Sequence, residues 1–182
     1  MKTITLSETE LSLLSQWQPL FDLFSDRGYQ SEEDICIKEL DPLLQRLNAN
    51  KWLEVLILEK GVLGSFYSIF LSTDKKTSGQ INGIQISLST LAPFAVIGLS
   101  RIHLSNESIA YSLLDYNELS NPQNMNCKIS KIVKECLRST CYKLVEPYQV
   151  NSKLPGGLKP IDYCKAKKPW DKLFHILFQS TD

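Results

Sequence analysis

Hydrophobic and polar residues follow three successive patterns along the chain. Apolar side chains recur at helical spacing in residues 8–47, alternate or run continuously in residues 52–116, and return to helical spacing from residue 127 onward. Turn-forming sequences such as DKKTSGQING separate the apolar runs of the middle part, as expected between antiparallel strands. This order predicts an α+β domain with one meandering, mainly antiparallel sheet of about five strands, flanked by N- and C-terminal helices.

The N-terminal part, residues 1–50, is expected to be helical. Ser7 and Glu10 have the spacing of a capping box, so a helix should begin at Glu8 and stop near Gly28. A polar loop with three consecutive acidic residues (Glu32, Glu33 and Asp34) should follow it. A second, short helix is expected over residues 37–47, where four leucines recur at helical spacing.

The middle part, residues 51–118, is expected to contain the sheet. Its apolar runs predict strands over residues 52–59, 65–73, 83–89, 94–105 and 109–116. In the fourth of these, the buried face changes near Gly98, and a glycine inside a strand often marks a bulge. We therefore expect a β-bulge at Gly98.

The C-terminal part, residues 126–182, is expected to contain two helices separated by an irregular stretch. An apolar stripe at helical spacing runs through residues 127–145, opposite a row of basic residues. Residues 151–168 are rich in Pro, Gly and Lys, and Pro169 is suited to the first turn of a last helix. Together the three parts are expected to form a single domain over residues 1–182.

The charge is distributed unevenly, although the formal net charge of the chain is zero. Residues 1–59 contain 11 acidic and 5 basic residues, a net of −6, whereas residues 125–182 contain 5 acidic and 11 basic residues, a net of +6. A net charge of zero argues against bulk affinity for nucleic acid or membranes. The two ends can neutralise each other within the fold or present oppositely charged faces to partners.

The cysteine pattern and the N-terminus indicate a cytoplasmic protein. Glu8 and Glu10 interrupt the apolar stretch of MKTITLSETELSLL, which is unlike a secretory signal. The uncharged residues 77–100 alternate between polar and apolar, which predicts strands rather than a membrane span. Five cysteines, at positions 36, 127, 136, 141 and 164, lack paired spacing, so we expect all of them to be reduced and mostly buried.

Candidate chemical groups are present, but none of them forms a recognisable motif. Neither G-x-S-x-G, H-E-x-x-H nor a Walker loop occurs, so we predict no cofactor, no metal site and no catalytic residue. Arg101 and His103 fall on one face of a predicted strand, which indicates either a small anion site or the solvent face of an antiparallel strand. Cys164 and His175 could form a thiol–imidazole pair, whereas a histidine on an apolar helix is more often a packed residue.

The segment KLPGGLKPIDYCKAKKPWDKLFHILFQ, residues 153–179, combines six lysines with Tyr163 and Trp170. Basic residues interleaved with aromatic ones are typical of single-stranded nucleic-acid binding. The domain lacks the basic excess that such proteins usually have. We therefore interpret the segment as a solvated connector before an apolar helix, and we predict no nucleic-acid partner.

Segments along the whole chain have a layout that resembles a family of bacterial proteins. They are SETELSLL, WLEVLILE, GIQISLS, FAVIGLSRIHLS and PWDKLFHILF. This layout resembles that of the immunity proteins that bacteria make beside secreted polymorphic or contact-dependent toxins. The resemblance implies a small cytoplasmic protein, a monomer or a homodimer, that blocks one toxin by tight, charge-complementary binding. These families share no common motif, so no functional residue is transferred from them.

The acidic N-terminal third is the expected contact surface for such a toxin, since many toxins of this kind are nucleases with basic clefts. Asp26, Glu32, Glu33 and Asp34 cluster where the first helix gives way to the polar loop, and we predict that they contact the toxin.

Two other functions fit the sequence. A secretion chaperone is similar in size and α+β plan, and would bind an effector in an apolar groove formed by WLEVLILE and SFYSIFL. An enzyme could assemble its site from scattered residues, namely Arg101, His103, Tyr111 and Cys164.

Overall fold

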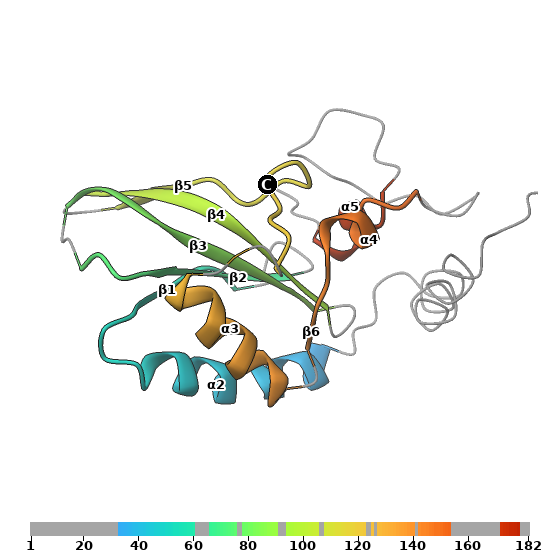
Figure 1. The fold of residues 1–182 in the computed structure, drawn as a ribbon, viewed down its shortest axis with the longest axis horizontal. Helices are drawn as coiled ribbons and strands as arrows, with labels where there is room; N and C mark the ends of the chain where they lie inside the picture. Colours follow the sequence, from blue (N-terminus) through green and yellow to red (C-terminus); the bar gives the residue numbers. More distant parts are fainter. Residues whose placement is uncertain are drawn as a thin grey trace, which may run out of the picture. The chain divides into compact units, whose positions relative to one another are not determined.

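The computed structural model describes residues 33–60, 66–75, 78–90, 94–105, 108–122, 125, 127–140, 142–153 and 172–178. The chain divides into two compact units, Met1–Ser31 and Glu32–Asp182, and the described residues all belong to the second (Figure 1). Its elements are, in chain order, α2 (Glu33–Asn48), β1 (Glu54–Lys60), β2 (Phe66–Ser72), β3 (Gly79–Ser89), β4 (Phe94–Leu104), β5 (Ile109–Tyr111), α3 (Lys128–Arg138), β6 (Lys143–Leu144), α4 (Pro147–Val150) and α5 (Leu173–Leu177). That residues 1–182 form one domain stays a prediction.

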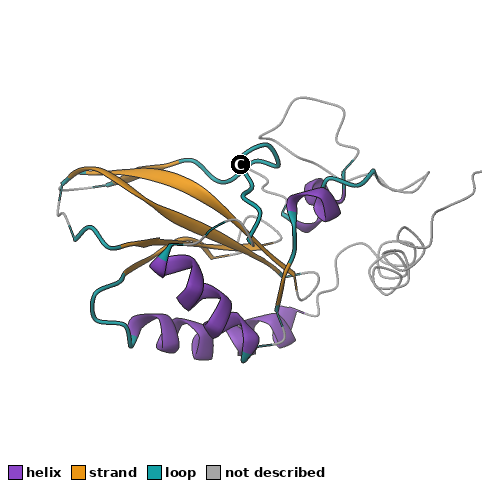
Figure 2. Ribbon diagram, in the orientation of Figure 1, coloured by secondary structure: helices purple, strands orange, loops and turns teal. Residues whose placement is uncertain are grey.

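The strands form one curled sheet with a meander at its centre. The order is β1-β2-β3-β4-β5, each strand is antiparallel to its neighbours, and β6 pairs in parallel with β4 (Figure 2). The curl brings the two ends of the meander together, since the hydroxyl of Tyr111 in β5 donates a hydrogen bond to the carbonyl oxygen of Leu58 in β1. The predicted α+β fold with a mainly antiparallel sheet is confirmed.

Helices α2 and α3 pack side by side on one face of the sheet (Figure 1). Alternate residues of each strand point to this face, because the side chains of a strand alternate between its two sides. The core between the layers contains Leu40, Leu43 and Leu47 of α2, Ile129, Val133, Cys136 and Leu137 of α3, and Ile69, Leu71, Ile84, Ile86, Leu88, Ala95 and Ile97 of the strands. The helical and alternating apolar patterns of the sequence therefore meet in a single core.

The opposite face of the sheet is divided between an apolar cluster and a polar stripe. Leu58, Phe70, Ile81 and Ile102 form the cluster within the curl. The stripe consists of polar residues of β2 and β3 that are almost completely buried, namely Ser68, Gln85, Ser87 and Ser89. The amide Nε2 of Gln85 donates a hydrogen bond of 2.7 Å to Ser68 Oγ, which links the two strands inside the sheet.

The helix predicted over residues 127–145 is wrong in its second half, because α3 ends at Arg138. The hydroxyls of Ser139 and Thr140 donate hydrogen bonds of 2.8 Å to the carbonyl oxygens of Cys136 and Leu137, which cap the last turn. The chain then turns back into the sheet as β6, and the amide of Val145 donates to the carbonyl oxygen of Ala95. Pairing with a distant strand thus replaces the second half of the helix.

The start of α2 also differs from the one predicted, and α4 is a helix that the sequence analysis did not predict. Helix α2 begins at Glu33, so Glu33 and Asp34 belong to its first turn rather than to a loop. Acidic residues are favourable there because the N-terminal end of a helix carries a partial positive charge. Pro147, just beyond the predicted helix over residues 127–145, begins α4, where a proline is tolerated at the first position.

Two strand predictions are corrected as well. β5 stops at Tyr111 instead of reaching residue 116. The register between β3 and β4 runs unbroken through Gly98, so the expected bulge at this glycine is wrong. The irregularity of the sheet lies in β1, between Ile57 and Glu59.

The last helix is shorter than predicted, but Leu173, Phe174, Leu177 and Phe178 are buried, in agreement with the prediction of an apolar helix.

Candidate functional site

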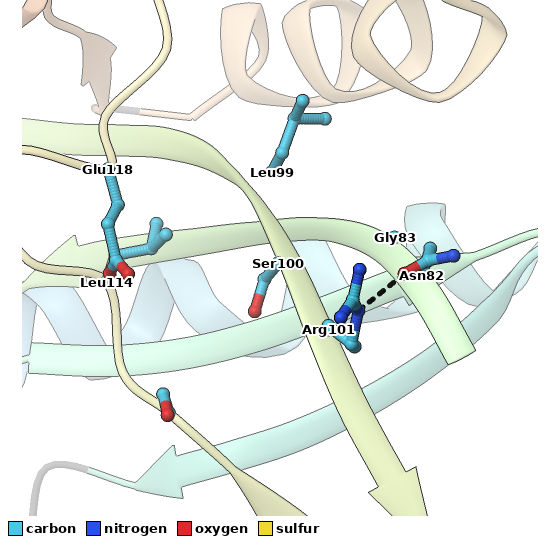
Figure 3. A pocket seen from close by; sticks show the side chains of 8 residues that line it. Asn82, Gly83, Leu99, Ser100, Arg101, Leu114 and Glu118 are labelled. Atoms are coloured by element: carbon cyan, nitrogen blue, oxygen red, sulfur yellow. Dashed lines mark hydrogen bonds between the residues drawn. The ribbon is translucent and has the colours of Figure 1, made fainter. Parts of the chain in front are cut away.

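A pocket of about 560 Å³ lies beside β4 and is the candidate binding site of the described chain (Figure 3). It is formed by side chains and backbone from β3, β4 and the connection that follows β5. The lining residues are Asn82, Gly83, Leu99, Ser100, Arg101, Ser112, Leu114 and Glu118. Volumes of about 300–1,000 Å³ are typical of pockets for small molecules.

The pocket lies where the outer edge of β4 lacks a neighbouring strand. β5 pairs with β4 only at residues 102–104, and an isolated bridge joins Gly98 to Leu119. Between these two places, at residues 99–101, no strand of the described chain pairs with this edge. The connection over residues 112–118 supplies the other wall, so the pocket is the gap between β5 and the bridge.

Gly98 allows this connection to approach the sheet closely. A Cβ atom at Gly98 would lie 2.6 Å from Leu114 Cδ2 and 2.7 Å from the carbonyl oxygen of Glu118. Such distances are shorter than ordinary contacts, so a larger residue would push Leu114 and Glu118 away from β4. The glycine at the predicted bulge instead shapes one wall of the pocket.

Two opposite charges line the pocket, and each is held by a neighbour. Arg101 Nε donates a hydrogen bond of 3.0 Å to Asn82 Oδ1, its partner across the β3–β4 ladder. Glu118 Oε2 accepts a hydrogen bond of 2.8 Å from the backbone amide of Asp115. Within the described chain, neither Arg101 nor Glu118 forms an ion pair. The pocket therefore presents one cation and one anion at the same time.

The remaining lining groups are two hydroxyls and two leucines. Leu99 is 68% exposed, a high value for a leucine in the middle of a strand, whereas Leu114 is buried. Ser100 and Ser112 supply hydroxyls, each of which can donate one hydrogen bond and accept others. Charged, polar and apolar groups in one concave site are suited to binding a ligand that has parts of all three kinds.

The structure brings only part of the predicted scattered site together. Arg101 lines the pocket, but His103 does not, and both side chains are exposed on the same face of β4. Their predicted exposure to solvent is thereby confirmed, although the same face of β4 buries Ala95 and Ile97 nearer the start of the strand. The hydroxyl of Tyr111 is hydrogen-bonded to Leu58, away from the pocket lining, and Cys164 lies outside the described residues.

His175 is a packed residue of α5. It is 1% exposed, and its Nδ1 accepts a hydrogen bond of 3.2 Å from the backbone amide of Lys172. Its ring meets that of Tyr116 edge to face at 5.5 Å, and Lys172 Nζ lies 3.5 Å from the centre of the same tyrosine ring. Of the two interpretations of His175, the structure favours packing. The pairing with Cys164 falls outside the described residues.

The predicted toxin contacts are described only in part. Glu33 and Asp34 lie in the first turn of α2, while Asp26 and Glu32 fall outside the described residues. Farther along α2, Asp41 is exposed. Helix α3, with four basic residues and one acidic residue, lies beside α2 (Figure 1). Helices of opposite net charge thus lie side by side.

Sequence reasoning missed most of the pocket lining. The apolar pattern places Ser112 and Leu114 in a strand, and Glu118 falls in a polar tract. The available signal was Gly98, because a glycine within a strand marks either a bulge or a close approach of another segment. The structure shows the second case.

The prediction that the cysteines are mostly buried is only partly correct. Cys136 is buried and free, but Cys127, just before α3, is free and exposed. Cys127 precedes the first turn of the helix and lies outside its buried stripe.

Two further findings concern the described residues alone. They contain no group of three or more His, Cys, Asp or Glu side chains placed to hold a metal ion. None of their helices has the length and apolarity that crossing a membrane requires.

No protein-family model matches the chain, and no curated protein or solved structure shows significant similarity to it.

Proposed function

We propose that the protein neutralises a cognate bacterial toxin by binding it through an acidic surface in the first third of the chain. The observation that supports this function is the net charge of −6 over residues 1–59. Its highest local density is in residues 26–34, which contain four acidic residues and one basic residue. Asp26, Glu32, Glu33 and Asp34 are the proposed contacts.

The position of α2 supports a contact at this end of the chain. One side of α2 is buried through Leu40, Leu43 and Leu47, so its opposite side is available to a partner. Asp34 and Asp41 are seven residues apart, positions that share one face of an α-helix, and Asp41 is exposed. The acidic residues of α2 are therefore not confined to its first turn.

The basic residues of α3 restrict where the acidic contact can lie. Helix α3 is next to α2, and Lys131 and Arg138 on it are exposed. Opposite charges on neighbouring helices weaken each other's field at the surface. We therefore centre the contact on the first turn of α2 and the residues before it, not on the whole of α2.

Strand β2 does not support the secretion-chaperone alternative. It requires an exposed apolar groove formed by the segments of β1 and β2. All seven residues of β2 are buried, whereas in β1 Leu58 is buried but Ile57 is 39% exposed. β2 therefore provides no exposed groove.

Reversing the four proposed contacts to lysine tests the function. Charge complementarity mainly steers association, so the association rate of this variant with the partner should be about ten-fold lower than that of the parent. Salt above physiological strength should likewise lower the association rate of the parent protein, because it screens the charges. The partner to be tested is the product of the adjacent gene, expressed with and without this protein. Circular dichroism and thermal unfolding establish that the reversed variant is folded, since lysines in the first turn of α2 are slightly unfavourable.

The single changes Asp34→Lys and Glu135→Lys form a matched control. Each alters the net charge equally, but Glu135 lies on the exposed side of α3. Only Asp34→Lys is expected to slow association. The proposal fails if the adjacent gene product is harmless to cells that lack this protein. It also fails if the variant with all four contacts changed to lysine protects cells as well as the parent protein does.

A further inference from the structure

We infer that the pocket beside β4 binds a small zwitterionic ligand, of the size of an amino acid or dipeptide, that carries an ammonium group, a carboxylate and an apolar side chain. The inference goes beyond toxin neutralisation and does not depend on it, because none of the proposed toxin contacts lines this pocket. It is based on the two opposite charges of the pocket, on the way they are held, and on the exposed leucine at its rim.

Arg101 and Glu118 are oppositely charged, and each keeps binding capacity. A guanidinium has five N–H donors, and within the described chain Arg101 uses only the Nε donor, toward Asn82. A carboxylate accepts at two oxygens, and Glu118 uses Oε2, toward the amide of Asp115. The two amino groups of Arg101 suit a ligand carboxylate, and Glu118 Oε1 suits a ligand ammonium. A ligand with a single charge would leave one of the two protein charges unmatched.

Both charged groups are held in place before a ligand arrives. Asn82 orients the guanidinium plane from the neighbouring strand. Glu118 is held by a tight turn, in which its own amide also donates a hydrogen bond of 2.9 Å to the carbonyl oxygen of Asp115. In Figure 3, Ser100 lies between Glu118 and Arg101. Holding polar groups in the geometry of the bound state reduces the entropy lost on binding.

The apolar part of the ligand is assigned to Leu99. This side chain is 68% exposed and lines the pocket. Covering it with an aliphatic group removes apolar surface from water, which favours binding. Leu114, on the other wall, adds apolar surface, and Ser112 adds a hydroxyl. The volume of the pocket and its charged, polar and apolar lining therefore suit a dipeptide of aliphatic residues.

The first test uses the parent protein and the dipeptide Leu-Leu as a probe. Isothermal titration calorimetry compares Leu-Leu with its N-acetylated form, which lacks the ammonium, and with its C-terminal amide, which lacks the carboxylate. We expect saturable binding of Leu-Leu, and affinity about ten-fold lower for each blocked form, as charged hydrogen bonds are lost. No saturable binding of Leu-Leu, or equal affinity for all three peptides, overturns the inference without any variant.

The second test assigns each ligand charge to one residue. Glu118→Gln should weaken Leu-Leu about ten-fold but leave the affinity for the acetylated peptide unchanged, since that peptide has no ammonium to lose contact. Arg101→Gln should likewise weaken the binding of Leu-Leu but leave the affinity for the amidated peptide unchanged, because that peptide has no carboxylate. Glu135→Gln and Arg138→Gln remove the same charges from exposed positions of α3 and should change nothing. If either pocket variant weakens all three peptides equally, the assignment is wrong.

Discussion

The phenolic hydroxyl of Tyr111 donates a hydrogen bond of 2.6 Å to the main-chain carbonyl oxygen of Leu58, and this bond joins the last strand of the meander to the first. The register of β1 shifts between Ile57 and Glu59, so the bonded carbonyl belongs to the bulged part of the strand. Bulges bend a strand and increase its twist. The bulge and the tyrosine together explain how a five-strand meander curls around the cluster that contains Leu58.

Tyr111→Phe is expected to lower the free energy of unfolding by about 1 kcal/mol, the usual net contribution of one hydrogen bond. Urea unfolding followed by circular dichroism measures this change. Tyr148→Phe is the matched control, because Tyr148 is 62% exposed and its change should stay within about 0.5 kcal/mol. Equal stabilities of the two variants would show that the bond does not hold the curl.

Gly98→Ala is expected to destabilise the protein by about 1–3 kcal/mol, because the added methyl group meets Leu114 and the carbonyl oxygen of Glu118. Gly79 provides a contrast: it has a φ of 87° and open space around its Cβ position, so its requirement for glycine comes from the backbone.

The relative stability of the alanine and asparagine variants distinguishes a steric requirement for glycine from a backbone requirement. Asparagine tolerates a positive φ better than alanine does, so Gly79→Asn should be more stable than Gly79→Ala. At Gly98 the larger asparagine should be the less stable of the two. The same order at both positions would contradict a steric role for Gly98.

Pro42→Ala is expected to raise the free energy of unfolding by about 2 kcal/mol. Pro42 lies inside α2 and is exposed, so it removes a helical hydrogen bond without filling the core. The gain is smaller than the full cost of a proline in a helix, because proline also restricts the unfolded chain. Gln45→Ala, at another exposed position of α2, is the control, and thermal unfolding of both variants is the measurement. A proline variant no more stable than this control would refute the expectation.

Cys127 and Cys136 should differ strongly in reactivity. Burial raises the pKa of the Cys136 thiol above its usual value of 9.0, Glu135 raises it further, and Arg46 partly opposes both. Thiolates are the reactive form, and Cys127 is exposed. Iodoacetamide at neutral pH should therefore modify Cys127 before Cys136, as followed by peptide mass spectrometry. Faster modification of Cys136 in the folded protein would contradict its buried position.

The raised pKa of Cys136 also predicts a loss of stability in alkali. Above pH 9.0 the thiol ionises in the unfolded chain while the folded protein keeps the proton, so ionisation stabilises the unfolded state. The contribution of the thiol to stability is present in full below pH 9.0 and is lost as the pH rises through the pKa of the folded protein. Cys136→Val should show a smaller decline in urea midpoint between about pH 8 and pH 10 than the parent, and an equal decline would assign the effect to other groups.

Local patterns in the sequence were sufficient for the class of the fold. The alternation through Ile84, Ile86 and Leu88 predicts β3, and these side chains are buried against the helices. The apolar spacing of Leu173 and Phe174 likewise predicts the buried side of α5. Such patterns are reliable because burial of one face depends only on residues a few positions apart.

Contacts between distant segments decided the rest. The stripe of α3 continues in the sequence as far as Leu144, yet residues 143–144 pair with Phe94 and Ala95, because the open edge of β4 satisfies their backbone groups. The pocket depends on the same edge: Ser112, Leu114 and Glu118 have no common spacing with Arg101, and they meet it only because Gly98 lets their segment lie against β4. Periodicity along a chain describes which side of an element is buried, whereas the partner of an unpaired strand edge is set by the packing of the whole sheet.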